Sequence, residues 1–144
     1  MAGPDCNESA VAERADGTLV LNMRSYRKGN RRLVSTSADG GETWTPPAAD
    51  EALVEPVCQG SLVRAGDLFL FSNPASLKRE NLTVKASRDG GRTWSAGSVL
   101  HPGPAAYSSL APLADGQVGC LYERGDKSAY ETITFARFPQ SWIK

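Results

Sequence analysis

The 144-residue sequence lacks a net charge, because its 16 lysine and arginine residues balance 16 aspartate and glutamate residues. This balance excludes the broad positive field with which proteins hold nucleic acids or anionic membranes. No apolar run approaches the length of a membrane span, and the N-terminal segment MAGPDCNES lacks the basic and apolar regions of a signal peptide. Any recognition of charge by this chain must therefore be local.

Cysteine is also scarce, with only Cys6, Cys58 and Cys120 present. An odd number at such wide spacing fits neither a disulfide framework nor a zinc ribbon. We interpret all three as packing residues. The length is that of one ordinary domain, which can bury a real core if its elements pack on each other.

What the sequence does contain is an internal repeat. The octet SADGGETW at 37–44 returns 50 residues later as SRDGGRTW at 87–94, with six of the eight positions identical. Short turns of sequence ADG, AGD and ADG, at 15–17, 65–67 and 114–116, recur at spacings of 50 and 49 residues. The repeated octet and the repeated turn are independent of each other, and together they define three units.

Short segments with the composition of β-strands flank each turn. They are 9–13, 18–22 and 32–36 in the first unit, 61–64, 68–72 and 82–86 in the second, and 108–113, 118–122 and 131–138 in the third. Because a sandwich would not repeat its turns in register, such units predict an all-β fold made of antiparallel β-propeller blades. We expect three blades, at approximately 8–50, 58–100 and 107–138, the last lacking its outer strand.

The residues of the octet can be explained as a motif that stabilises the turn of a β-hairpin. Asp39 and Asp89 can accept hydrogen bonds from turn amides, the paired glycines permit positive φ, and the tryptophans can fill the apolar gap between sheets. The alternative, a calcium loop, lacks the further carboxylates and the terminal glutamate that such a site needs, so no metal is predicted. The structural positions of the two octets are Ser37, Asp39, Gly41, Trp44, Ser87, Asp89, Gly91 and Trp94.

Alignment of the three units on their turns places Glu8, Cys58 and Tyr107 at one common position, seven residues before each turn. In a propeller the first strand of each blade lines the central channel, so equivalent positions gather around one rim. We therefore expect Glu8 and Tyr107 to face a common space although 99 residues separate them. From the residue types alone, the alternative is a solvated surface acid and a half-buried aromatic ring, the usual fate of both.

The octets resemble the Asp-boxes of sialidases, which also occur in several non-enzymatic propellers. Four further segments resemble sialidase active-site strands: GPDCNES at 3–9, LNMR at 21–24, FSNPASLKR at 71–79 and GPAAYSSL at 103–110. The match as a whole extends over nearly the entire chain, in the family's order. The resemblance implies a six-bladed sialidase propeller, of which this chain would form the C-terminal half of the catalytic domain.

Carried over residue by residue, the resemblance implies that Tyr107 is the nucleophile and Glu8 the carboxylate that activates it. It implies that Arg24 and Arg79 are two of the three arginines that bind the substrate carboxylate. Sialic acid bears that carboxylate on its anomeric carbon, so a neutral phenol approaches without like-charge repulsion. A phenol with a pKa near ~10 is a poor nucleophile unless a neighbouring carboxylate takes its proton. Glu123, in a sialidase-like Leu-Tyr-Glu segment, is a candidate supporting residue.

The implied function is that of a retaining exo-α-sialidase that releases terminal sialic acids from sialylated glycans without a cofactor. The family's acid/base aspartate and third arginine lie in an N-terminal segment with an Arg-Ile-Pro-like motif, which this sequence does not contain; Asp5, Asp16 and Asp126 stand in other contexts. We therefore expect the missing N-terminal half of the propeller to be a partner. The chain alone is expected to be inactive and to associate through its uncovered face.

The alternative function is a non-catalytic Asp-box propeller module that binds acidic sugars. Binding needs only arginines, so the presence of both Glu8 and Tyr107 favours the enzyme, and transfer to an acceptor sugar remains open within that class. The resemblance also implies an exported parent enzyme, whether periplasmic, extracellular or lysosomal. The remaining basic residues are interpreted as surface charge: Arg27, Lys28, Arg31, Lys78 and Arg92.

Overall fold

The computed structural model describes residues 5–144, so the first two residues of the segment 3–9 lie outside the described residues. The described chain is all-β apart from one short 3-10 helix, η1. Its elements, in chain order, are β1 (Cys6–Glu13), β2 (Leu19–Ser25), β3 (Arg31–Ser37), β4 (Ala48–Val54), β5 (Ser61–Ala65), β6 (Leu68–Pro74), β7 (Glu80–Ser87), β8 (Ser98–Pro112), β9 (Gln117–Arg124), β10 (Thr132–Pro139) and η1 (Gln140–Trp142). Among these residues no helix has the length and hydrophobicity of a membrane span.

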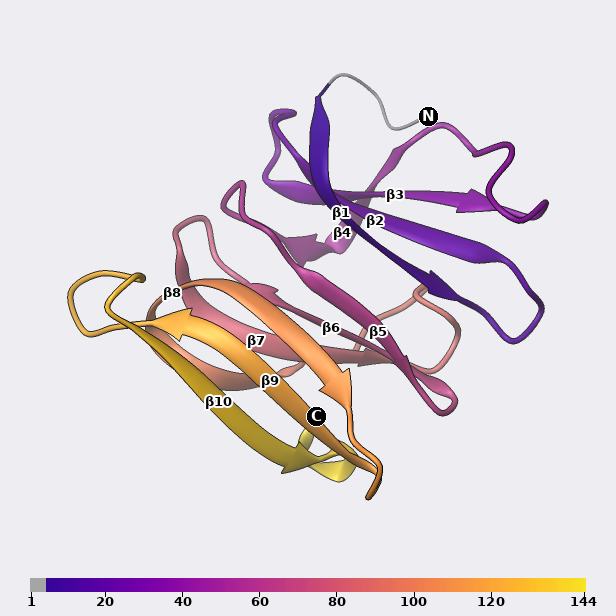
Figure 1. Ribbon diagram of the computed structural model, residues 1–144. Helices are drawn as coiled ribbons and strands as arrows, with labels where there is room; N and C mark the ends of the chain where they lie inside the picture. The colour runs from indigo at the N-terminus through magenta and orange to yellow at the C-terminus, as the bar shows by residue number, and fades with distance from the viewer. Residues whose placement is uncertain (1–4) are drawn as a thin grey trace.

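The strands form two antiparallel sheets (Figure 1). The first has the order β1-β2-β3-β4, and the second has six strands in the order β10-β9-β8-β7-β6-β5. Within each sheet, strands that follow one another in sequence are paired, as the predicted antiparallel units require. The first strands of successive units also meet, since β1 contacts β5 and β5 contacts β8.

The 15-residue strand β8 belongs to two groups of strands within the larger sheet. Its first part pairs with β7, as in the partners Val99 and Thr83, and its second part, from Ala105 to Pro112, pairs with β9. One continuous strand is therefore both the last strand of the second unit and the first strand of the third.

Two strand segments were not predicted from the sequence. β4, AADEALV, is an edge strand with mostly exposed side chains, so it needs no alternation of apolar and polar residues. The predicted third-unit strand at 108–113 in fact begins ten residues earlier, at Ser98. Its first part contains the turn-like residues His101 to Pro104, and the register with β7 is irregular there. Proline is tolerated where the ladder is already interrupted.

A core cluster fills the space between the two sheets. It combines Ala12 and Val20 of the first sheet with Leu62, Phe69 and Phe71 of the second. Full burial of a ring such as Phe71 contributes about 1.5–3 kcal/mol to folding, so this cluster is a principal reason why the sheets hold together. A second cluster packs the strands of the larger sheet around Leu70, Leu82, Val84, Val118 and Cys120.

Both octets form the same hydrogen-bonded turn. In the second octet, Ser87 Oγ donates to Asp89 Oδ1 at 2.7 Å and accepts from the Gly91 N–H at 2.7 Å, and Asp89 Oδ1 also accepts from the Thr93 N–H at 2.9 Å. The first octet repeats these contacts. The paired glycines have φ values of 75° and 99° in the first octet and 69° and 82° in the second, where other residues are strained.

The two octet tryptophans differ in their surroundings. Trp94 packs against the cluster between the sheets, with its ring centroid 5.9 Å from that of Phe71, and its indole N–H donates to Asp50 of β4 at 3.0 Å. Trp44 instead donates to the Gly41 carbonyl of its own turn at 2.9 Å. The second octet therefore links the two sheets, whereas the first closes only its own hairpin.

We expect Asp89→Asn to change the acid stability of the chain. Hydrogen bonds from Thr93 and neighbouring groups hold the pKa of Asp89 well below its usual range. A lowered folded-state pKa stabilises the fold above the unfolded pKa, and this stability is lost as pH falls through the folded value. The melting temperature of Asp89→Asn should therefore be lower at pH 7, with a difference from wild type that narrows below about pH 4.

Thermal melting followed by circular dichroism from pH 7 to pH 2 measures this difference. Asp67→Asn, at the exposed β5–β6 turn, is the control and should follow the wild-type curve at every pH. If the difference in melting temperature between Asp89→Asn and wild type stayed constant with pH, stabilisation by the ionised Asp89 carboxylate would be contradicted.

The outer face of β9 and β10 is apolar and uncovered. Leu121 and Phe135 are direct cross-strand partners, and Ile133 lies on the same face with 70% of its surface exposed. The Phe135 ring lies over Gly119, where an added Cβ would come within 2.9 Å of the ring. Contiguous apolar surface of this kind is typical of a protein interface.

Candidate functional site

Glu8 lies at a β-bulge near the start of β1. The register between β1 and β2 shifts between Asn7 and Ser9, and Glu8 itself has a φ of 32°. Bulges of this kind turn a side chain away from the regular alternation and are frequent next to functional sites. The bulge presents the Glu8 carboxylate to residues of β2 and β8.

Tyr107 lies at a second bulge, in β8. The register between β8 and β9 shifts between Ala105 and Ser108. The backbone N–H of Tyr107 donates to Glu123 Oε2 at 3.1 Å, and that of Ser108 donates to Gln59 Oε1 at 3.0 Å. Side chains of β9 and of the segment before β5 thus satisfy the amides that the bulge frees from the ladder.

The structure brings Glu8, Tyr107 and Arg24 together in one hydrogen-bonded group. The Tyr107 hydroxyl donates to Glu8 Oε1, and Arg24 Nη1 donates to Glu8 Oε2. Arg24 Nη1 also lies 3.3 Å from the Tyr107 hydroxyl oxygen. The meeting of Glu8 and Tyr107 expected from the turn register is therefore present.

The surroundings of this group set the protonation states of its members. Burial raises the pKa of Glu8, but the hydrogen bonds from Tyr107 and Arg24 outweigh it and leave that pKa below its usual value. The hydrogen bond to Glu8 raises the pKa of Tyr107, and burial raises it further. At neutral pH Glu8 is thus a carboxylate that accepts a hydrogen bond from a neutral phenol, the arrangement from which a carboxylate can act as a base.

Arg79 lies near two aromatic rings, one of which belongs to this group. Its guanidinium carbon is 5.8 Å from the centre of the Tyr107 ring and 6.0 Å from that of Tyr130. Nη1 donates to the Tyr130 hydroxyl, and Nη2 donates to the Val57 carbonyl at 3.3 Å. These cation–π contacts and hydrogen bonds together restrict the orientation of the planar group.

The connection between β4 and β5 forms the wall behind Tyr107. Val57 has a φ of 53°, which is strained for a β-branched residue, and strain of this kind gathers at functional sites. Cys58, the residue aligned with Glu8 and Tyr107, is buried and packs against Ala106 and Tyr107. Burial raises the pKa of its thiol to about 11, so the thiol stays protonated and serves in packing.

A fully buried ion pair fixes this connection, and sequence reasoning missed it. Arg32 Nη1 donates to Glu55 Oε2 and to the Cys58 carbonyl, both at 2.9 Å, and neither side chain of the ion pair has exposed surface. Arg32 Nε donates to Asn22 Oδ1 at 2.7 Å, and Glu55 Oε1 accepts from the Ser25 N–H at 2.8 Å. The network joins the connection to the strand that carries Arg24.

The other charged residues singled out from the sequence lie away from this group. Arg27 forms an exposed ion pair with Asp5 at 3.5 Å, and Arg31 forms one with Glu51 at 3.3 Å. Asp16 lies in the β1–β2 turn. No group of three or more His, Cys, Asp or Glu side chains within residues 5–144 is placed to hold a metal ion.

Comparison with known proteins identifies the family to which these features belong. A family model described as a BNR repeat-like domain matches residues 2–120. The chain belongs to the sialidase family with BNR repeats. The sialidase of Micromonospora viridifaciens is 34% identical over 152 residues, covering 98% of this chain and 23% of the relative. That of Bacteroides fragilis is 39% identical over 135 residues, covering 85% of this chain and 25% of the relative. The chain thus spans about a quarter of the length of these sialidases.

Solved sialidase structures share the fold of this chain. The Hadza microbial sialidase Hz136 superposes with a TM-score of 0.83 at 38% identity, covering 97% of this chain and 29% of that protein. Trypanosoma rangeli sialidase superposes with a TM-score of 0.73 at 28% identity, covering 95% of this chain and 24% of that protein. The two sheets therefore match part of a sialidase propeller.

Proposed function

We propose that this chain forms part of a retaining exo-α-sialidase that releases terminal sialic acids from glycoconjugates. The observation that carries the proposal is the hydrogen-bonded group of Glu8, Tyr107 and Arg24, with Arg79 against the Tyr107 ring. Residues 99 positions apart supply a phenol and a carboxylate in contact, which a site that only binds an acid does not need.

In the proposed reaction, Tyr107 Oη attacks the anomeric carbon of the sialoside while Glu8 takes the phenolic proton. The bond from that carbon to the leaving oxygen breaks, and the leaving oxygen receives a proton from a general acid, which, we propose, the other half of the propeller supplies. A glycosyl–tyrosine intermediate results. Water then attacks the anomeric carbon and gives a proton to the conjugate base of that acid, while the bond to Tyr107 Oη breaks and Glu8 returns its proton to the phenolate.

Arg24 and Arg79 would bind the carboxylate of the substrate. Both guanidiniums lie beside Tyr107, and each is held by contacts that leave some of its five N–H donors for a ligand. Charge-assisted hydrogen bonds to a carboxylate contribute roughly 1.5–3 kcal/mol each, which is enough to favour acidic over neutral sugars. The arginines would thus set the substrate class while Tyr107 and Glu8 perform the chemistry.

We further propose that residues 8–50, 58–100 and 107–138 are three blades of a six-bladed propeller whose other half supplies the acid/base aspartate and a third arginine. The uncovered apolar face of β9 and β10 supports this arrangement, because a neighbouring blade would bury Ile133 and Phe135. We call this chain together with the remainder of the propeller the completed enzyme.

Proton NMR of an aryl sialoside during hydrolysis by the completed enzyme tests the proposal. The α-anomer of sialic acid should appear first, because two displacements retain configuration. Glu8→Gln should lower kcat by about 10²–10⁴-fold and remove the acidic limb of the pH profile, since only the ionised carboxylate acts as a base. Initial release of the β-anomer, or binding without turnover as in a non-catalytic module, would contradict it.

A further inference from the structure

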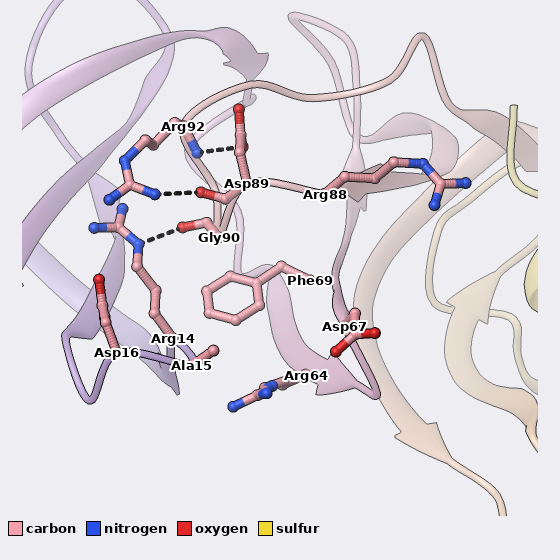
Figure 2. Close-up of a pocket in the computed structure, with 10 residues that line it drawn as sticks. All are labelled: Arg14, Ala15, Asp16, Arg64, Asp67, Phe69, Arg88, Asp89, Gly90 and Arg92. Atoms are coloured by element: carbon pink, nitrogen blue, oxygen red, sulfur yellow. Dashed lines mark hydrogen bonds between the residues drawn. The ribbon is translucent and has the colours of Figure 1, made fainter.

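A cavity lies at the end of the strands opposite Glu8 and Tyr107. It has a volume of about 360 Å³ and opens between the β1–β2 turn of the first sheet and two turns of the second, the β5–β6 turn and the second octet (Figure 2). Glu8 and Arg14 are six residues apart along β1 and its end, which at about 3.3 Å per residue is roughly 20 Å. The cavity is thus distinct from the proposed sialidase site.

Arg14, which follows β1 of the first sheet, reaches the second octet turn, which itself contains Arg92. Arg14 Nε donates to the Gly90 carbonyl at 2.8 Å, and Arg92 Nη1 donates to the Asp89 carbonyl at 2.7 Å. Figure 2 shows their guanidiniums side by side above the turn, whereas Arg88 points away from them. Gly90 permits the approach, because an added Cβ would lie 2.8 Å from Arg14 Cγ and Nε.

Asp16 and Asp89 line the cavity beside this pair but do not form ion pairs with it. Within residues 5–144, neither guanidinium takes part in an ion pair. The Asp89 carboxylate accepts instead from Ser87 and Thr93. Burial lowers the pKa of Arg14, and the charge of Arg92 lowers it further, against smaller opposing effects of Asp16 and Asp89. Two like charges held together in a cavity favour the binding of an anion.

We propose that Arg14 and Arg92 form an oxyanion-binding site, which takes a carboxylate, sulfate or phosphate group in the cavity beside the second octet. Each backbone contact uses one N–H of its arginine and fixes the planar group, so the remaining donors are already oriented. Such pre-orientation reduces the entropy that a guanidinium loses on binding an oxyanion. The cavity lining contains four arginines and three aspartates, so its formal charge remains positive.

Titration of the arginine Nε–H signals of the full chain, by ¹H–¹⁵N NMR at constant ionic strength, tests this site. Sulfate, phosphate and free sialic acid are added separately, with neutral lactose as the blank. The Arg14 and Arg92 signals should shift saturably with at least one anion, and the anion that binds identifies the source of the oxyanion. Shifts that grow linearly with every anion would overturn the proposal, and this test needs no substitution.

Three variants assign the site. Arg14→Gln and Arg92→Gln should each weaken the binding by about tenfold or more, as expected for loss of a charged hydrogen-bond donor. Arg88→Gln, a cavity-lining arginine that points away from the pair, should bind as wild type. Arg24→Gln should also leave this binding intact, so that failure here is distinguishable from failure of the sialidase proposal. Equal weakening by Arg88→Gln would show only general attraction to basic surface.

Discussion

Tyr107→Phe in the completed enzyme is expected to lower kcat for an aryl sialoside by about 10³-fold or more. The substitution removes one oxygen, which is the proposed nucleophile and the donor to Glu8, and retains the ring against Arg79. Loss of a nucleophile removes the covalent route, and the residual rate reflects binding and orientation alone. Steady-state kinetics should show the loss in kcat with little change in KM.

Tyr122→Phe is the matched control for that experiment. Tyr122 lies on the adjacent strand β9, and its ring is buried in the core of the larger sheet. Removal of its hydroxyl should change kcat by less than about twofold, as for a group that does not touch the reacting atoms. Turnover by Tyr107→Phe at the wild-type rate would remove Tyr107 from its proposed role.

Arg32→Met is expected to lower the free energy of unfolding by about 3–5 kcal/mol, because it leaves Glu55 buried without its partner. A loss of that size is a large fraction of the stability of an ordinary domain and should lower the melting temperature by on the order of 10 °C. The substitution should also disturb the position of Tyr107, since Arg32 donates to the carbonyl of Cys58, which packs against Tyr107. Urea denaturation of the full chain measures the change.

Two variants separate the buried charge from packing. Arg31→Met removes the neighbouring arginine, whose partner Glu51 is exposed, and should cost less than about 1 kcal/mol. The double variant Arg32→Met/Glu55→Met removes both buried charges and should recover much of the stability lost in the single variant. If the single and double variants were equally unstable, packing and not the unpaired carboxylate would explain the loss.

The turn register predicted the pairing of Glu8 with Tyr107 because repeated units reproduce their backbone geometry. Residues at the same distance in sequence from equivalent turns occupy equivalent positions in their units. The sequence spacing therefore predicts which residues of different units lie near one another. The same register placed Cys58 beside them, and the structure has Cys58 in contact with Tyr107. Short apolar segments predicted most strands for a similar reason, since burial of one face imposes alternation.

The features that sequence reasoning missed lack such a signal. β4 lies at a sheet edge and is largely exposed, so no alternation marks it. The pairing of Arg32 with Glu55 joins residues 23 positions apart, and it is specified by a buried environment that appears only after the strands have packed. Tyr130 contacts Arg79 from an exposed loop, where residue type alone does not mark a functional role.

Covalent trapping tests the central claim most directly. In a sialosyl fluoride that also carries fluorine at C3, the added fluorine slows hydrolysis of the intermediate by opposing positive charge at the anomeric carbon. Fluoride leaves without a general acid, so trapping depends chiefly on the nucleophile and its base. Mass spectrometry of the digested enzyme should place one sialyl adduct on the peptide that contains Tyr107, and none in Tyr107→Phe. An adduct on another residue, or turnover without any adduct, would contradict the account.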